Sequence, residues 1–245
     1  MGFTELNSVE HYIIHQMTGV NLNAAQDNNQ VNEPHGEYGL QWKFQSPEQL
    51  GRGVNEVLLE SELVKALIRL NPEIETNPNL ADEVIHKLRA ILISVNQVGL
   101  VKANEEFFAW MTGEKTMPFG ENNRHVPVNL IDFDDLTRND YVVTNQFRIH
   151  HRETKIPDVV LMINGIPVVV GEAKTPIRPS VSWLDGAHEV HSIYENAVPQ
   201  LFVPNILSFV LTLTLLRAMF SAVIKTSLYV ISVLPLKIFI VLDCK

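Results

Sequence analysis

The first half of the chain has apolar residues at helical spacing. They recur three and four positions apart and predict helices over residues 8–17, 50–70, 80–95 and 104–112. Asn7 and Asn79 are the expected N-caps of the first and third helices. Gly19 and the Asn71-Pro72 step are expected to end the first and second helices. Between the first two helices, the polar residues 21–39 predict a long surface loop.

The pattern changes after residue 140. Three β-rich runs predict strands at residues 141–149, 159–163 and 166–171. Asn164-Gly165 separates the last two runs and is the strongest two-residue hairpin signal in the chain. A further helix is expected around residues 183–196. Helices first, then strands, then a helix predict an α+β or α/β fold with a central mixed sheet and a helical N-terminal elaboration.

Charged residues stand where a buried hairpin should have none. Asp158 opens the second strand, and Glu172 and Lys174 close the third. The two-residue period of a strand places Glu172 and Lys174 on one face, with Ala173 pointing away. Because the Asn-Gly turn folds the two strands back on each other, we expect Asp158 to meet them at the open end of the hairpin.

Two carboxylates and an ammonium at one strand end are the groups that Mg²⁺-dependent phosphodiester hydrolysis needs. Asp158, Glu172 and the backbone carbonyl of Ala173 are the expected metal ligands, since Mg²⁺ prefers oxygen donors and keeps several waters. Lys174 is expected to orient the attacking water and to stabilise developing negative charge. The alternative without chemistry is a surface hairpin that ends in a Glu–Lys pair.

These residues form the PD…(D/E)xK pattern of a nuclease superfamily, here Pro157-Asp158…Glu172-Ala173-Lys174. In addition, the chain from about residue 5 to 205 resembles the N-terminal region of type I restriction enzyme R subunits. The resemblance is carried by ordered blocks at residues 50–59, 63–72, 155–176, 183–194 and 198–205. It implies a domain over residues 1–205 with a restriction-endonuclease-like core at about 140–205.

The resemblance also implies two accessory residues. The acidic residue that the family carries on its first helix corresponds to Glu10, whose alternative role is helix capping. Tyr194 matches a tyrosine on the helix after the sheet, although here a role in the core is favoured over a DNA contact. The family's glutamine four residues before that tyrosine is replaced by Val190.

Family members are ATP-driven DNA translocases that cleave double-stranded DNA in complex with modification and specificity subunits. The motor needs a G-x-x-x-x-G-K-[ST] phosphate loop, and this chain has none, so we expect it to be truncated before the helicase-like motor. The expected activity is therefore the nuclease part alone, with Mg²⁺ as cofactor and no ATP site. The alternatives are a catalytically silent assembly module of the R subunit and a stand-alone repair or recombination nuclease.

Charge and cysteine content refine this picture. The chain has a net charge of −9, and residues 1–140 carry 10 Lys and Arg against 21 Asp and Glu. A protein that grips DNA by itself normally shows a basic footprint, so most phosphate contacts are expected from partner subunits or the missing motor. A lone cysteine, Cys244, and a start without a secretory signal favour the cytoplasm.

Residues 206–245 form an atypical apolar tail with a single acidic residue, Asp243. Three interpretations compete: a membrane segment over residues 206–224, a buried element that completes the sheet, and a frameshifted or truncated tail never selected to fold. Arg217 within the stretch argues against the membrane, since a charge near the bilayer centre costs about 2.5–3.5 kcal/mol. We favour the third interpretation, because the family pattern stops abruptly after Asn205.

Overall fold

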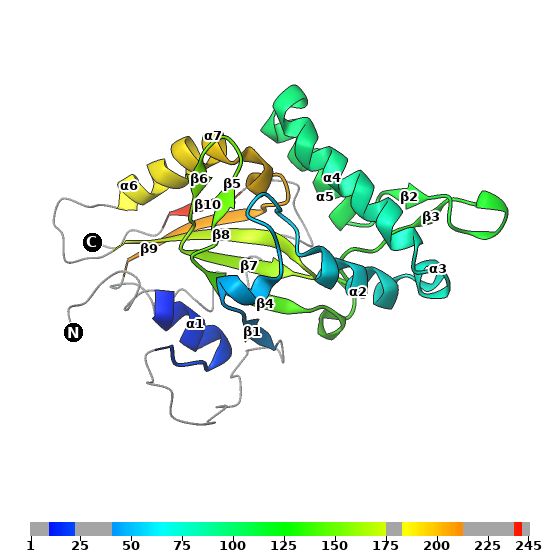
Figure 1. Cartoon of the computed structure of the whole chain (residues 1–245), viewed down its shortest axis with the longest axis horizontal. Coiled ribbons are helices and arrows are strands. Elements are labelled where there is room, and N and C mark those ends of the chain that lie inside the picture. The colour runs from blue at the N-terminus through cyan, green and yellow to red at the C-terminus, as the bar shows by residue number, and fades with distance from the viewer. Residues whose placement is uncertain (1–9, 23–40, 175–182, 213–237, 242–245) are drawn as a thin grey trace.

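A computed structural model describes residues 10–22, 41–174, 183–212 and 238–241. It centres on a six-stranded mixed sheet in the order β1-β4-β7-β8-β9-β10 (Figure 1). The strands are β1 (Trp42–Phe44), β4 (Tyr141–Asn145), β7 (Val159–Ile163), β8 (Ile166–Lys174), β9 (Leu207–Thr212) and β10 (Ile238–Val241). β4, β7 and β8 pair antiparallel, whereas β1 is parallel to β4, and β8, β9 and β10 are parallel to one another.

Helices cover this sheet, which confirms the predicted mixed class. The α-helices are α1 (His11–Thr18), α2 (Glu60–Leu70), α3 (Pro72–Thr76), α4 (Leu80–Val98), α5 (Leu100–Met111), α6 (Trp183–His188) and α7 (Glu195–Ala197). α1 lies against β1 and β4, and α6 lies against β8 and β9. Both helices lie toward the end of the sheet that faces away from the α4–α5 hairpin (Figure 1).

Short elements complete the described chain. A π-helical turn, Glu189–Tyr194, joins α6 to α7. Two small ribbons pair β2 (Thr116–Met117) with β3 (Val126–Pro127) and β5 (Ile149–His150) with β6 (Thr154–Lys155). The 3-10 turns are Pro47–Leu50, Glu121–Asn123, Leu136–Arg138 and Pro199–Phe202.

Most predicted elements are present, with instructive differences at their ends. Gly19 ends α1 in the left-handed conformation, as predicted, whereas Asn79 makes no side-chain capping bond at α4. Asn7 and most of the predicted loop lie outside the described residues. The short helix predicted at 104–112 is the longer α5, because its pattern starts at Leu100, directly after Gly99.

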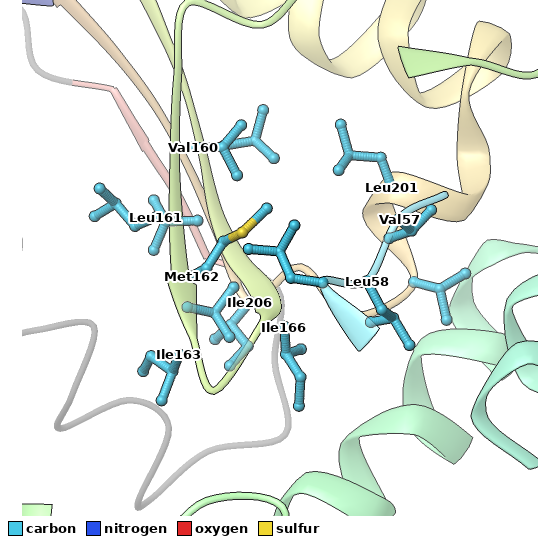
Figure 2. Close-up of a cluster of buried hydrophobic side chains, with 14 of the residues drawn as sticks. Val57, Leu58, Val160, Leu161, Met162, Ile163, Ile166, Leu201 and Ile206 are labelled. Carbon is cyan, nitrogen blue, oxygen red and sulfur yellow. The ribbon is translucent and has the colours of Figure 1, made fainter. Parts of the chain in front are cut away.

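The helix predicted over residues 50–70 is wrong in its first half, because α2 begins only at Glu60. Gly51 takes a φ of 63°, which no right-handed helix allows, and the chain after it is not helical. Val57 and Leu58 are buried there and pack toward the sheet (Figure 2). The apolar spacing that resembled a helix therefore belongs to an irregular core segment.

β7 and β8 run through the middle of the core and are buried on both faces. Figure 2 shows Val160 and Met162 pointing toward Leu58 and Leu201, while Leu161 and Ile163 point the other way. Strands covered on both sides need apolar residues at every position, which explains the nearly continuous apolar runs in the sequence.

The Asn164-Gly165 turn that joins β7 to β8 is anchored as well as tight. Both residues have positive φ, 51° and 80°, as a type I′ hairpin turn requires. The Asn164 side chain is fully buried, accepts from the Asp140 N–H at 2.8 Å, and donates to the Leu130 carbonyl at 2.8 Å. The Gly165 carbonyl accepts from the Leu59 N–H at 2.9 Å. The turn therefore has a fixed place against the start of α2.

β9 brings the first part of the apolar tail into the sheet. Leu207 pairs with Val169 of β8, and Phe209 pairs with Gly171. The start of the tail thus pairs with the sheet, and its residues 207–210 are buried, which agrees with the second interpretation, a buried element that completes the sheet. An apolar run without turn residues suits an interior parallel strand, because such a strand is covered on both faces.

In the ranges that the structure covers, no helix is long and apolar enough to cross a membrane. The suggested membrane segment begins at Ile206, directly before β9, and its part after β9, residues 213–224, falls outside those ranges.

Replacing Gly165 with alanine is expected to destabilise the fold strongly. A Cβ there would lie 2.5 Å from the Leu59 carbonyl oxygen, in addition to the cost of a positive φ. Gly51→Ala is the matched control, since Gly51 also has a positive φ but nothing within 4 Å of its Cβ position. In denaturant titrations we expect a loss of about 1–2 kcal/mol for Gly51→Ala and clearly more for Gly165→Ala. Equal losses would contradict the packed turn.

The packing of β9 on β8 predicts coupling between Gly171 and Phe209. A Cβ at Gly171 would lie 2.2 Å from the Phe209 ring. Gly171→Ala should therefore destabilise the wild-type background and do much less harm beside Phe209→Ala, which opens the space. A double-mutant cycle on the free energy of unfolding measures this coupling, expected at about 1–3 kcal/mol. Additive losses would show that β9 does not pack there.

Candidate functional site

The β7–β8 register brings the two predicted acids together. Val159 pairs with Gly171, so the residues just before and after this pair, Asp158 and Glu172, lie side by side at the open end of the hairpin. Asp158 Oδ2 accepts a hydrogen bond from the Ala173 N–H at 2.8 Å. Glu172 is only 4% exposed, whereas Asp158 is half-buried. One carboxylate is thus fixed by the backbone next to the other.

The structure extends β8 beyond the predicted 166–171 to include all three residues of the Glu172-Ala173-Lys174 motif. Ala173 is buried at 1% exposure, and the backbone of Lys174 pairs with Thr212 of β9. The side chain of Lys174 lies outside the described atoms, so its predicted role stays a prediction.

Glu10, the acidic residue before α1, belongs to the same site. Its side chain is 1% exposed, and Glu10 Oε1 accepts from the Gln146 side-chain amide at 2.9 Å. The Asn145 amide approaches the other Glu10 oxygen at 3.4 Å. A carboxylate at the N-cap of α1 therefore reaches the end of β4, more than 130 positions later in the chain.

Gln146 is a site residue that the sequence analysis missed. The same Nε2 that binds Glu10 also donates to Asp158 Oδ1 at 3.2 Å. The only signal in the sequence was that the predicted strand 141–149 is imperfectly alternating. That strand is in fact broken: β4 ends at Asn145, and Gln146 takes a positive φ of 48°.

The break at Gln146 has a clear hydrogen-bond pattern. The Gln146 N–H donates to the Asp158 carbonyl and the Phe147 N–H to the Pro157 carbonyl, both at 3.0 Å. Successive N–H groups of a regular strand point to opposite sides, so both can reach the same neighbour only if the backbone twists between them. The left-handed conformation of Gln146 provides that twist.

Arg52 holds this twisted segment in place. Its guanidinium carbon lies 3.5 Å from the centre of the Phe147 ring, and the group donates to the carbonyls of Arg148 and Glu56. Cation–π stacking and several carbonyl contacts are a combination that a planar guanidinium makes and a lysine does not. Arg52, in the Gly51-Arg52 block of the sequence, therefore stabilises the chain segment that follows Gln146.

Tyr194 is 5% exposed and borders the acidic site. Its hydroxyl donates to Glu189 at 3.1 Å. Burial, followed by the negative charges of Glu172 and Glu189, raises the pKa of Tyr194 above its ordinary value, and Asp158 contributes in the same direction. The hydroxyl consequently keeps its proton. Val190, which replaces the family's glutamine, is fully buried and offers no polar group.

The donor set suits a hard divalent cation. Asp158 and Glu172 offer carboxylate oxygens beside the backbone of Ala173, and oxygen is the donor that Mg²⁺ prefers. Over the described ranges, no cluster of three or more His, Cys, Asp or Glu side chains could hold a metal by itself. A divalent cation beside Asp158 and Glu172 would need a backbone carbonyl and water to complete its coordination.

Comparison with known proteins identifies the family of the chain. The sequence-family model for the type I restriction enzyme R protein N terminus matches residues 33–227 of the chain. The chain belongs to this family. The match continues past Asn205, where the sequence analysis expected the resemblance to end, and includes β9.

Two curated relatives are similar to part of the chain. The chain is 28% identical over 154 residues to the type I restriction enzyme HindI endonuclease subunit of Haemophilus influenzae, covering 61% of this chain. It is 26% identical over 153 residues to a putative type I restriction enzyme MjaIXP endonuclease subunit of Methanocaldococcus jannaschii, covering 60% of this chain. In each case the alignment spans 14% of the relative's length.

The raised pKa of Tyr194 predicts a pH dependence of stability in this R-protein domain. Because the folded-state pKa lies above the unfolded value of 10.0, the protonated hydroxyl contributes its full stabilisation below pH 10. This stabilisation is lost as the pH rises toward the folded-state pKa. Tyr194→Phe removes this loss. Between pH 9 and 11, wild type should lose more stability than Tyr194→Phe in urea titrations, by up to about 1.4 kcal/mol. Parallel curves for the two proteins would contradict the raised pKa.

Proposed function

We propose that the chain is the endonuclease module of a type I restriction-modification system, hydrolysing DNA phosphodiester bonds with Mg²⁺. The observation that carries the proposal is the pairing that sets Asp158 beside Glu172, with the Ala173 N–H bonded to Asp158. Membership of the R-protein N-terminal family supports the same reaction, because relatives in that family bear the name endonuclease subunit.

Each residue has a role that its chemistry supports. Asp158, Glu172 and the carbonyl of Ala173 would hold the ion. When bound, Mg²⁺ supplies charge that polarises the scissile phosphate and lowers the pKa of a bound water. Lys174, two residues after Glu172 on the same strand, orients the attacking water and stabilises the charge that develops on the phosphate. Glu10 and Tyr194 border the acids as accessory groups.

The charge of the chain supports a division of labour with partners. A net charge of −9 offers little attraction to DNA phosphates. We propose that double-stranded DNA is delivered by the modification and specificity subunits and by the motor part of an R subunit, where ATP would be used. The relatives extend far beyond the aligned region, which leaves room for such a motor.

Lys174→Ala tests the catalytic assignment. We expect cleavage of plasmid DNA in Mg²⁺ to fall at least about 100-fold, because the group that stabilises the transition-state charge is lost. The assay uses the 245-residue chain alone, and then a full-length R subunit with modification and specificity subunits and ATP. Lys65→Ala is the control, since Lys65 is an exposed lysine on α2 that pairs with Glu62.

The results separate the proposed function from its alternatives. Cleavage by the chain alone would favour a stand-alone nuclease. No cleavage by the chain, with cutting by the complex that Lys174→Ala abolishes, would establish a nuclease module that depends on its partners. Full cutting by the Lys174→Ala complex would overturn the catalytic site and favour an assembly module.

A further inference from the structure

Gln146 lies between two buried or half-buried carboxylates that come from distant parts of the chain. Its Nε2 lies 2.9 Å from Glu10 Oε1 and 3.2 Å from Asp158 Oδ1. A primary amide nitrogen has two hydrogens, so it can serve both acceptors at once. The two carboxylates thereby share one neutral donor group.

This sharing matters because like charges repel strongly where water is scarce. Glu10 is 1% exposed and Asp158 is half-buried, so solvent screens them poorly. An N–H donor to each ionised oxygen favours the charged form without adding a charge. A cation in place of Gln146, such as lysine, would instead neutralise the acids and compete with a metal ion for them.

The backbone of Gln146 is in a strained conformation, so its placement costs conformational energy. Its φ of 48° is a conformation that side-chain-bearing residues rarely adopt. Arg52 stacks on the next residue, Phe147, and fixes the segment from behind. Strained positions that the surroundings hold firmly are frequent at functional sites.

Asp158 is then held at both oxygens. Gln146 donates to Oδ1 and the Ala173 N–H donates to Oδ2. Two fixed donors leave the carboxylate little freedom to rotate, and its remaining lone pairs have a defined direction. Fixed orientation of a ligating carboxylate raises metal affinity, because less entropy is lost on binding.

We propose that Gln146 is a positioning residue that orients Asp158, and keeps Glu10 beside it, for a divalent cation. The inference rests on the proposed function and adds a residue outside the PD…(D/E)xK pattern. Gln146 acts through Asp158 and need not touch the ion or the DNA.

The test measures Mn²⁺ and Mg²⁺ binding to the full 245-residue chain by titration calorimetry, without DNA. Gln146→Met keeps an unbranched side chain of the same length but removes the two N–H donors of the amide. We expect its Kd to rise at least about tenfold, the usual effect of removing a group that orients a metal ligand. Gln97→Met, at an exposed glutamine on α4, is the control and should leave the Kd unchanged.

Gln146→Gly separates the side chain from the backbone. Glycine adopts a φ of 48° without strain, so the twist after β4 is retained while the amide is lost. We expect the same loss of affinity as for Gln146→Met. A purely structural role would change the thermal unfolding of the metal-free protein and leave the Kd of the folded variants at the wild-type value.

Asp158→Asn distinguishes failure of the inference from failure of the proposed function. Metal binding by wild type that Asp158→Asn abolishes, together with unchanged affinity in both Gln146 variants, would overturn the role of Gln146 alone. Metal binding that survives Asp158→Asn, or no metal binding by wild type, would overturn the proposed metal site and the role of Gln146 with it.

Discussion

The antiparallel pairing of β7 with β8 is the constraint on which the rest of the structure depends. Its register sets Val159 opposite Gly171, so Asp158 and Glu172 are neighbours although 13 residues separate them. A slip of one residue would turn every side chain of one strand to the other face and separate the acids. The buried Asn164 side chain and the Gly165 contact with Leu59 prevent such a slip at the closed end.

The sequence predicted this hairpin well because its signals are local. A continuous apolar run, an Asn-Gly turn and charged residues at the strand ends can each be recognised within a few positions. The bounds of β7 agree with the prediction, and both turn residues have the positive φ that it implies. The mixed sheet followed from the order of helices and strands.

What the sequence could not predict depends on contacts between distant segments. Gln146 meets Glu10 only because α1 lies against the edge of the sheet beside β4, and no local pattern contains that information. Residues 50–59 looked helical because burial on an irregular path can imitate helical spacing. β1 was missed because a strand of three residues carries no alternating pattern, and β9 was only one of three interpretations because an apolar run alone does not identify a strand.

The contact of Gly171 with Phe209 ties β9 to the acidic hairpin. β8 has β7 on one side and β9 on the other, and the missing Cβ at position 171 leaves room for the aromatic ring. Opening β9 would remove a neighbour from the strand that carries Glu172 and would admit water to a nearly dry carboxylate. Amide hydrogens of β8 and β9 should therefore exchange together. Selection that preserves Glu172 would then also act on β9, which lies more than thirty residues downstream.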